Sequence, residues 1–234
     1  MGFLQKLEYR LGRYAVRNLI TIIVLGMALV FVCDLLFAEK MAQIGGIWAN
    51  GVSGLLSMDR ELVLSGQVWR LVTFVFVPPS SGIYFMVFAL YFYWMIGSAL
   101  ERDWGSFRFG VYYLCGIIGT IISGFITGWA DNSYLNMSLF FAFAMLYPNF
   151  EMRIFFILPV KVKWLAWLDG ALFILLFIIG NWSIKAAILA AMLNFFLFFG
   201  KDFINSIKSF IARSKYRGSV RRGERENRNY WKNR

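Results

Sequence analysis

The sequence of 234 residues contains no histidine, and this absence excludes several kinds of chemistry. Serine and cysteine nucleophiles activated by a neighbouring imidazole, zinc sites of the His-Glu-x-x-His kind and haem held by histidine are all removed. Cysteine occurs only twice. Because Cys33 and Cys115 both lie inside apolar runs, we expect buried small hydrophobic residues, not a disulfide or a metal pair.

Charged residues are scarce as well, and apolar residues take their place. The charged fraction is 16% and the hydrophobic fraction 59%, whereas soluble domains have about 25% and about 45–50%. The chain also carries 25 Phe, 11 Tyr and 9 Trp, more aromatic volume than one soluble core of this size can enclose. The composition therefore predicts an integral membrane protein.

Six apolar runs are candidates for membrane-spanning helices, each of which needs about 20 residues. They are residues 19–38, 82–100, 109–130, 133–147, 164–180 and 184–200. The fourth run is short, so it should start below the surface or be shielded by neighbouring helices. The predicted fold class is an all-α membrane protein with six transmembrane helices. We expect the first helix to be retained, because it is long for a signal peptide and lacks a convincing cleavage site.

The distribution of Lys and Arg predicts the orientation. With the N-terminus in the cytoplasm, only Lys40, Arg60, Arg70 and Lys185 of the 24 basic residues fall outside, and the other twenty fall inside. This asymmetry obeys the positive-inside rule. It predicts a multi-pass protein with both termini in the cytoplasm, which we assign to the plasma membrane of a prokaryote.

Three regions are predicted along the chain. Residues 1–17 form an interfacial amphipathic segment, 18–200 the membrane domain, and 201–234 a basic tail that is amphipathic and then disordered. We expect anionic lipids to contact both termini. An acidic cytoplasmic partner of the tail is a second interpretation of its charge. No cofactor, metal or DNA partner is expected.

The segment between the first two runs, about 39–81, is too long for a simple connector. It is apolar and is broken into short pieces by glycines. We expect a structured outer loop that is embedded in the membrane interface.

Two motifs frame the second span. Trp69-Arg70 closes the outer loop, and Glu101 precedes Gly105 by four positions at the end of the span. This pattern resembles the rhomboid superfamily, whose members carry a Trp-Arg motif in the first loop and a Glu-x-x-x-Gly motif after the second helix. The resemblance covers about residues 18–200 and implies a rhomboid-like six-helix bundle.

Each motif also has a structural interpretation that is independent of the family. Arg70 can bond backbone carbonyls and hold the loop, while Trp69 anchors at headgroup depth. Glu101 can pair with Arg102 or cap neighbouring helix ends. In the third span, small residues form a stripe that favours close helix packing. The glycines of this stripe are Gly116, Gly124 and Gly128.

The departures from the resemblance concern catalysis. Active rhomboids use a serine in a Gly-x-Ser-Gly turn at the start of the fourth helix and a histidine on the sixth. Here the corresponding positions are Ser138, without flanking glycines, and Asn194, and an amide cannot serve as a general base. The stretch 136–149 is similar to the Derlin branch. The resemblance therefore implies a catalytically inactive pseudoprotease that binds transmembrane segments of client proteins, in membrane protein quality control or trafficking.

Alternatives remain open from the sequence. An active intramembrane serine protease with an unusual site would need a Ser138–Lys185 pair, and the Gly-x-Ser-Gly string at 51–54 lies in the wrong element. A small transporter or channel would use Asp34 or Asp169 as its coupling site. Asp169 has two interpretations: a functional intramembrane charge, or a structural residue that pairs with Lys163 or Arg102 or is protonated. A structural bundle that only tethers a partner to its tail is the third alternative.

A polar patch is also expected from three residues on the fourth and sixth spans. Asn136, Ser138 and Asn194 could together face a lateral opening, where a helix with polar residues is held.

Overall fold

The computed structural model describes residues 8–44, 51–79, 83–154 and 158–200. The chain divides into two compact units, Met1–Phe195 and Phe196–Arg234, and the description below concerns the first. The predicted amphipathic tail at 201–234 and the first seven residues of the N-terminal segment lie outside the described residues.

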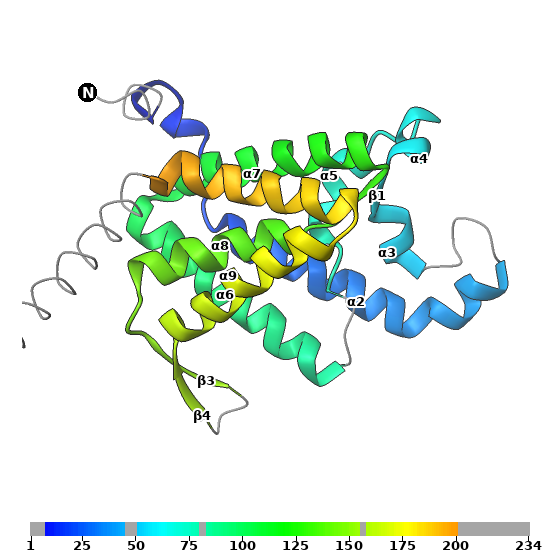
Figure 1. The fold of residues 1–234 in the computed structure, drawn as a ribbon. Coiled ribbons are helices and arrows are strands. Elements are labelled where there is room, and N and C mark those ends of the chain that lie inside the picture. The colour runs from blue at the N-terminus through cyan, green and yellow to red at the C-terminus, as the bar shows by residue number, and fades with distance from the viewer. Residues whose placement is uncertain (1–7, 45–50, 80–82, 155–157, 201–234) are drawn as a thin grey trace, which may run out of the picture. The chain divides into compact units, whose positions relative to one another are not determined.

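The membrane-spanning helices agree with the six predicted runs. Long apolar helices in the described part are α2 (Leu19–Ile44), α6 (Ile83–Trp104), α7 (Ser106–Thr127), α9 (Val162–Ile179) and the helix Trp182–Gly200, and α8 (Ser133–Leu146) is a shorter apolar helix. Figure 1 shows these helices as coiled ribbons. The predicted fold class, a six-helix membrane bundle, is confirmed.

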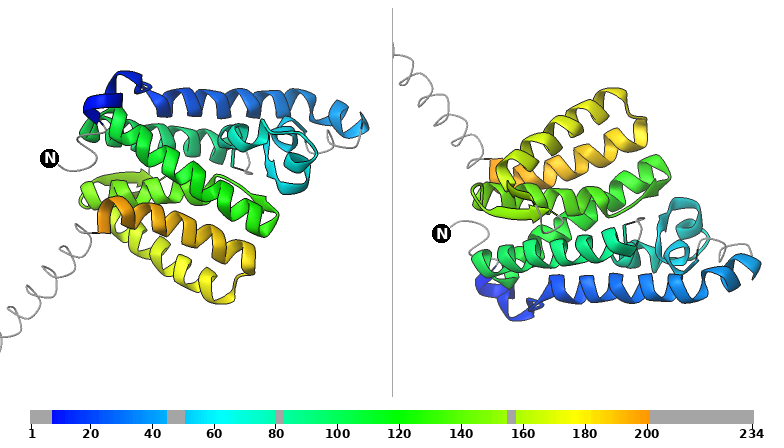
Figure 2. Two further views of the ribbon diagram at one scale, coloured as in Figure 1. Left: turned by 90° about the horizontal axis from the view of Figure 1, so that it is seen from above. Right: turned by 90° about the horizontal axis from the view of Figure 1, so that it is seen from below.

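Helix α8 lies inside the bundle. Its 14 residues extend only about 21 Å at 1.5 Å per residue, less than the ~30 Å hydrocarbon core of a bilayer. It packs against α6, α7 and α9, and Figure 2 shows it among the longer helices. Ring contacts of Phe140 with Phe92 and of Phe141 with Phe173 and Phe195 surround it. The neighbouring helices therefore shield the short helix, as predicted.

Short elements form the connections. The outer loop holds α3 (Gly51–Leu56), β1 (Met58–Asp59), α4 (Arg60–Leu64), α5 (Arg70–Thr73) and η3 (Phe74–Phe76); β2 (Trp129–Ala130) precedes α8, β3 (Glu151–Ile154) and β4 (Leu158–Lys161) follow it, and η1 (Gly12–Tyr14) precedes α2. Strand β1 pairs with β2 and β3 with β4, both antiparallel. The first pairing joins the outer loop to the α7–α8 connection.

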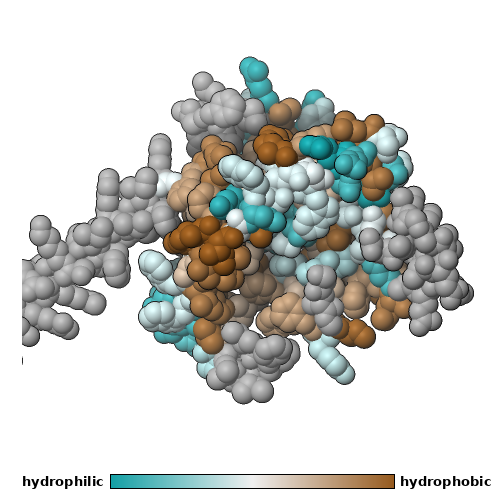
Figure 3. Space-filling model, turned by 45° about the vertical axis from the view of Figure 1, so that its right-hand side comes forward, coloured by the Kyte–Doolittle hydropathy of each residue, from teal (hydrophilic) through white to brown (hydrophobic). Residues whose placement is uncertain are grey.

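Polar and apolar side chains are distributed as expected for a protein in lipid. Large apolar residues of the spans are exposed, among them Leu25 and Leu29 on α2 and Ile126 on α7. Figure 3 shows brown apolar side chains on one face, between paler and teal ones. Several polar residues are instead buried, among them Arg70, Glu101, Asn136, Ser138 and Asn194. Because lipid replaces water outside, buried polar groups in the bundle mark the places where function or assembly needs them.

The carboxylate of Glu101 joins three helices at their neighbouring ends. Its Oε1 accepts hydrogen bonds from the backbone N–H of Asn18, before α2, and from the hydroxyl of Ser106, at the start of α7, each at 2.7 Å. Gly105 lies between α6 and α7 with φ +80°, a conformation that glycine adopts without steric cost. The Glu-x-x-x-Gly motif therefore turns the chain, and Glu101 caps the start of α2, one of the roles expected for it, while it also binds the Ser106 side chain of α7.

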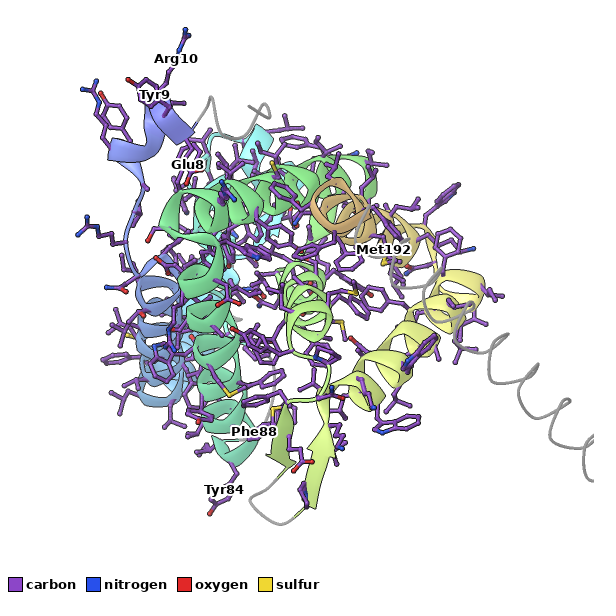
Figure 4. The ribbon with its side chains drawn as sticks, turned by 90° about the vertical axis from the view of Figure 1, so that its left-hand side faces the viewer. Glu8, Tyr9, Arg10, Tyr84, Phe88 and Met192 are labelled. Atoms are coloured by element: carbon purple, nitrogen blue, oxygen red, sulfur yellow. The ribbon has the colours of Figure 1, made fainter. Side chains whose placement is uncertain are left out.

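The start of the described chain is joined to α7. An ion pair links Glu8 to Arg108, with Nη2 and Oε2 2.9 Å apart. Figure 4 shows Glu8, Tyr9 and Arg10 at this end and Tyr84 at the far end of α6, pointing outward. Both partners are partly exposed, so the pair contributes at most about 1 kcal/mol.

Replacing Glu101 with alanine should destabilise the bundle. Glu101→Ala removes two hydrogen bonds to a buried carboxylate, and we expect a loss of about 3 kcal/mol in the free energy of unfolding. Thermal unfolding followed by tryptophan fluorescence in mild detergent measures it. Asp103→Asn, at an exposed site two residues away, is the control and should change stability by less than ~1 kcal/mol. Equal effects of the two variants would contradict the capping role.

Candidate functional site

Arg70 holds the outer loop together. It is fully buried, and its Nη1 donates to the carbonyl oxygens of Gly54 and Ser57, both at 2.7 Å. Its Nε donates to Oε1 of Gln67 at 2.8 Å. Burial lowers the pKa of the guanidinium, and the charge of Asp59 opposes this shift. Arg70 therefore connects α5 to the end of α3, as expected for a residue that bonds loop carbonyls.

Trp69 lies beside this connection. Its ring is half exposed, and its Nε1 donates to the carbonyl of Leu55 at 3.4 Å. An indole with an apolar body and one bonded N–H suits the interface between lipid and water.

Asp34 caps the first helix of the outer loop. Its Oδ1 accepts the backbone N–H of Val52 at 2.6 Å, and its Oδ2 accepts the hydroxyl of Ser53. The Gly-x-Ser-Gly string at 51–54 is therefore the start of α3, bound by a carboxylate that favours a helix N-terminus. A carboxylate occupied in this way does not suit the transporter reading, in which Asp34 would bind the coupling ion.

The outer loop is also joined to the α7–α8 connection. In addition to the β1–β2 pairing, Asn132 donates to the carbonyls of Val75 and Val77 at 3.0 and 2.9 Å. Beside it, burial raises the pKa of Asp131, and a hydrogen bond from the backbone N–H of Ser133 opposes this shift. Loop and bundle therefore share one set of contacts at the start of α8.

The three glycines expected to pack helices lie in different surroundings. A side chain at Gly116 would collide with Leu135 of α8 and approach Nδ2 of Asn194 to 3.0 Å. One at Gly124 would meet Met58 of the outer loop and Ala130. Gly128 is the left-handed C-cap of α7, with φ +96°. Gly116 therefore admits two helices, whereas Gly124 admits the loop and Gly128 ends the helix. The last two differ from the expected helix–helix stripe.

Ser138 is held by hydrogen bonds inside the bundle. The hydroxyl of Tyr112 on α7 donates to Oγ of Ser138 at 3.1 Å and to its carbonyl oxygen at 3.0 Å. The Ser138 hydroxyl itself donates to the carbonyl of Leu135 at 2.8 Å. Its proton is therefore engaged by the helix backbone, and a neutral phenol faces its oxygen.

Asn194 reaches the same face of α7. It is 3% exposed and lies at Gly116, four residues after Tyr112, and positions four apart share one face of a helix. In the part of the chain that the structure describes, neither Oδ1 nor Nδ2 of Asn194 has a hydrogen-bond partner. The structure thus brings Ser138 and Asn194 to one face without joining them.

A second buried amide lies on α8. Asn136 is 3% exposed, and it lies near the hydroxyl of Tyr93 on α6. Within the described residues neither of its amide atoms meets hydrogen-bond geometry, nor does the hydroxyl of Tyr113 on α7. Burying such groups without partners costs about 1–3 kcal/mol each. The interior of the bundle thus retains hydrogen-bonding capacity that its own fold leaves unused.

Lys185 and Asn194 lie on the same helix but at different levels. It stands nine residues before Asn194, about 13 Å along a helix axis, whereas Asn194 and Ser138 meet the same face of α7. The geometry therefore gives no support to a Ser–Lys pair.

Asp169 lies on α9 without the expected basic partner. Among the described residues its Oδ2 is buried and has no hydrogen-bond partner. Lys163 instead lies over the ring of Trp164, with Nζ 5.8 Å from its centroid. The pairing with Lys163 or Arg102 that the sequence suggested is not found in the described ion pairs.

Some residues of the site were not anticipated. Tyr112, Tyr113 and Asn132 carry or surround the contacts of α8. Their signal in the sequence is weak, because a tyrosine inside a span looks like one more aromatic residue. Only the packing of α7 on α8 shows that a hydroxyl is directed at Ser138.

The comparisons with known proteins give one family. The family model described as Rhomboid domain matches residues 65–201, from the outer loop to the end of the last span. This range includes the Trp69-Arg70 and Glu101-x-x-x-Gly105 motifs, Ser138 and Asn194. No curated protein matches the chain.

Replacing Arg70 with lysine should loosen the outer loop. Lysine keeps the charge but lacks the planar guanidinium that bonds two carbonyls and Gln67 at once. We therefore expect the free energy of opening the loop to fall by about 2–3 kcal/mol. Faster chymotrypsin cleavage between residues 51 and 79 would report it. Arg60→Lys is the control, because Arg60 makes one longer side-chain bond, to the carbonyl of Phe125 at 3.3 Å. If both variants are cleaved equally fast, the central role of Arg70 is wrong.

Proposed function

Because the chain belongs to the rhomboid family, we propose that it is a catalytically inactive member that binds transmembrane segments of client proteins. It is an integral, multi-pass membrane protein. Its activity would be recognition within the bilayer, in membrane protein quality control or trafficking. We further propose that both termini face the cytoplasm of a prokaryote, in accord with the distribution of Lys and Arg.

The observation that carries the proposal is that the described residues in contact with Ser138 include no general base. The chain has no histidine, and Asn194 and Ser138 both contact the same face of α7. A serine hydroxyl becomes a nucleophile only when a neighbouring group takes its proton. Here the Ser138 hydroxyl donates a hydrogen bond to the carbonyl of Leu135, and a backbone carbonyl is too weak a base to remove the proton. Proteolysis by a Ser–His dyad is therefore not available to this chain.

The same positions favour binding. The amide of Asn194 offers a donor and an acceptor that the described residues leave unpaired, and the amide of Asn136, beside the Tyr93 hydroxyl, meets hydrogen-bond geometry with none of them. A client helix with a polar side chain, or one whose backbone is locally unwound, could satisfy them. Hydrogen bonds between helices in lipid contribute about 0.6–2 kcal/mol each, enough to select among segments that are otherwise equally apolar.

Asn194→Leu should separate binding from stability. Leucine removes two buried, unpaired polar atoms, so we expect the free energy of unfolding to rise by about 1–2 kcal/mol. The amount of client protein that co-purifies in mild detergent should fall at the same time. A purely structural asparagine would give the reverse, a less stable protein.

Ser123→Ala is the matched control for this experiment. The hydroxyl of Ser123 is also buried and unpaired within the described residues, but it lies next to Gly124, beneath the outer loop. Its removal should also maintain or raise stability, and it should leave the client yield unchanged. A loss of clients with both variants would mean that the effect is not specific to Asn194.

Ser138→Ala tests inactivity directly. The purified protein, reconstituted with a model transmembrane substrate, should produce no cleavage product, and the variant should behave in the same way. Product formation that disappears in Ser138→Ala would overturn the proposal and establish a protease with an unusual site.

A further inference from the structure

Asp169 is a carboxylic acid inside a membrane-spanning helix. It follows Val162, the first residue of α9, by seven positions, which places it about 10 Å along the helix axis. Charged side chains at such depth are costly and usually face a partner or a water-filled space. Of the acidic residues described in or beside the spans, Asp34 and Glu101 are occupied in capping. Asp169 caps no helix among the described residues, and its Oδ2 has no hydrogen-bond partner there.

Among the described residues, no cation pairs with Asp169. Lys163 lies six positions earlier, about 120° away around the helix, and it lies over Trp164. The ion pairs of the described residues join Glu8 to Arg108 and Glu151 to Lys161. A carboxylate oxygen is thus buried without the compensation that a buried charge normally requires.

One flank of Asp169 is open. On the other flank, α9 meets α8 through Gly170, which lies beside Phe141, and through Phe173, whose ring contacts Tyr134 and Phe141. The open flank carries an exposed apolar ridge at helical spacing: Leu168 is 69%, Leu172 43% and Ile179 69% exposed. Only Val162 and Phe173 of α9 are buried, so most of this helix is available to lipid or to another helix.

We propose that Asp169 is the docking point for a transmembrane helix that carries a lysine or arginine. The partner helix lies along the ridge of Leu168, Leu172 and Ile179, and its basic group pairs with the carboxylate of Asp169. This inference rests on the proposed function and names a class of client. Charge complementarity decides the occupant, because an apolar helix or a lipid chain would leave the carboxylate unpaired, and an acidic helix would be repelled.

The depth of Asp169 makes the recognition positional. An oppositely charged group gains most when it lies at the same level in the low-dielectric core. A basic residue about 10 Å inside its own span, measured from the end that corresponds to Val162, meets this condition. A basic residue at the far end of a span does not, because it reaches the opposite interface instead.

Synthetic transmembrane peptides can test the pairing. Peptides of about 20 Leu and Ala residues would carry one Arg at the matched depth, one Arg at the far end, one Asn, one Glu or no polar residue. Binding to the full-length protein in lipid vesicles would be measured by fluorescence energy transfer. We expect the matched Arg peptide to bind at least about tenfold more tightly than the apolar one, as close charge pairs at interfaces do.

Variants of Asp169 assign the effect. Asp169→Asn keeps the shape and should remove the advantage of the Arg peptide without changing the binding of the Asn peptide. Asp169→Lys should reverse the preference toward the Glu peptide. Asn194→Leu should weaken the binding of the Asn peptide and leave the tighter binding of the matched Arg peptide unchanged. Folding of each variant is checked by its thermal transition in the same vesicles.

The outcomes separate the two proposals. If the Asn peptide binds through Asn194 but Arg brings no advantage, the docking point at Asp169 is wrong and client binding stands. If the two Arg peptides bind equally tightly, the docking point at Asp169 is also wrong, because surface charge then explains their affinity. If no peptide binds better than the apolar one, both proposals fail.

Discussion

A helix that is too short to cross a bilayer has to be covered by its neighbours. The 14 residues of α8 would leave part of the span without a helix if they faced lipid, where no water can bond a free backbone group. Helices α6, α7 and α9 therefore pack around α8. The β1–β2 pairing and Asn132 join the outer loop to the start of α8. The outer loop, the polar interior and the apolar exterior all follow from this central position.

The central position also explains why polar residues are found on α8. Around α8 the interior is shielded from lipid, so it is the place where amides and hydroxyls can be kept. Tyr112 and the Leu135 carbonyl engage Ser138, while Asn136 and Asn194 remain unpaired within the described residues. A fold selected only for stability would replace these amides with apolar groups. Their retention suits a protein that exchanges its own unsatisfied groups for those of a bound segment.

Much of the fold was predictable because two of its constraints are local. The length of each apolar run determines whether it can span, so the six helices were found with ends displaced by a few residues. The roles of Arg70 and Glu101 were also foreseeable. A buried guanidinium beside a loop has only carbonyls to bond, and a carboxylate at a helix junction has free backbone N–H groups close to it. The position of Ser138 and Asn194 followed from the family resemblance, not from the periodicity.

Composition, spacing and charge by themselves determined the membrane character, the number of helices and the absence of a histidine base, because each depends on residue types along one stretch of chain. Only the tertiary structure decided the partners. It put Gly124 against Met58 and made Gly128 a helix end. It also used Asp34 to cap α3 and, within the described residues, left Asp169 unpaired with Lys163, which lies six positions before it. Those outcomes depend on which side of a helix faces which neighbour, and that orientation is set when distant segments pack together.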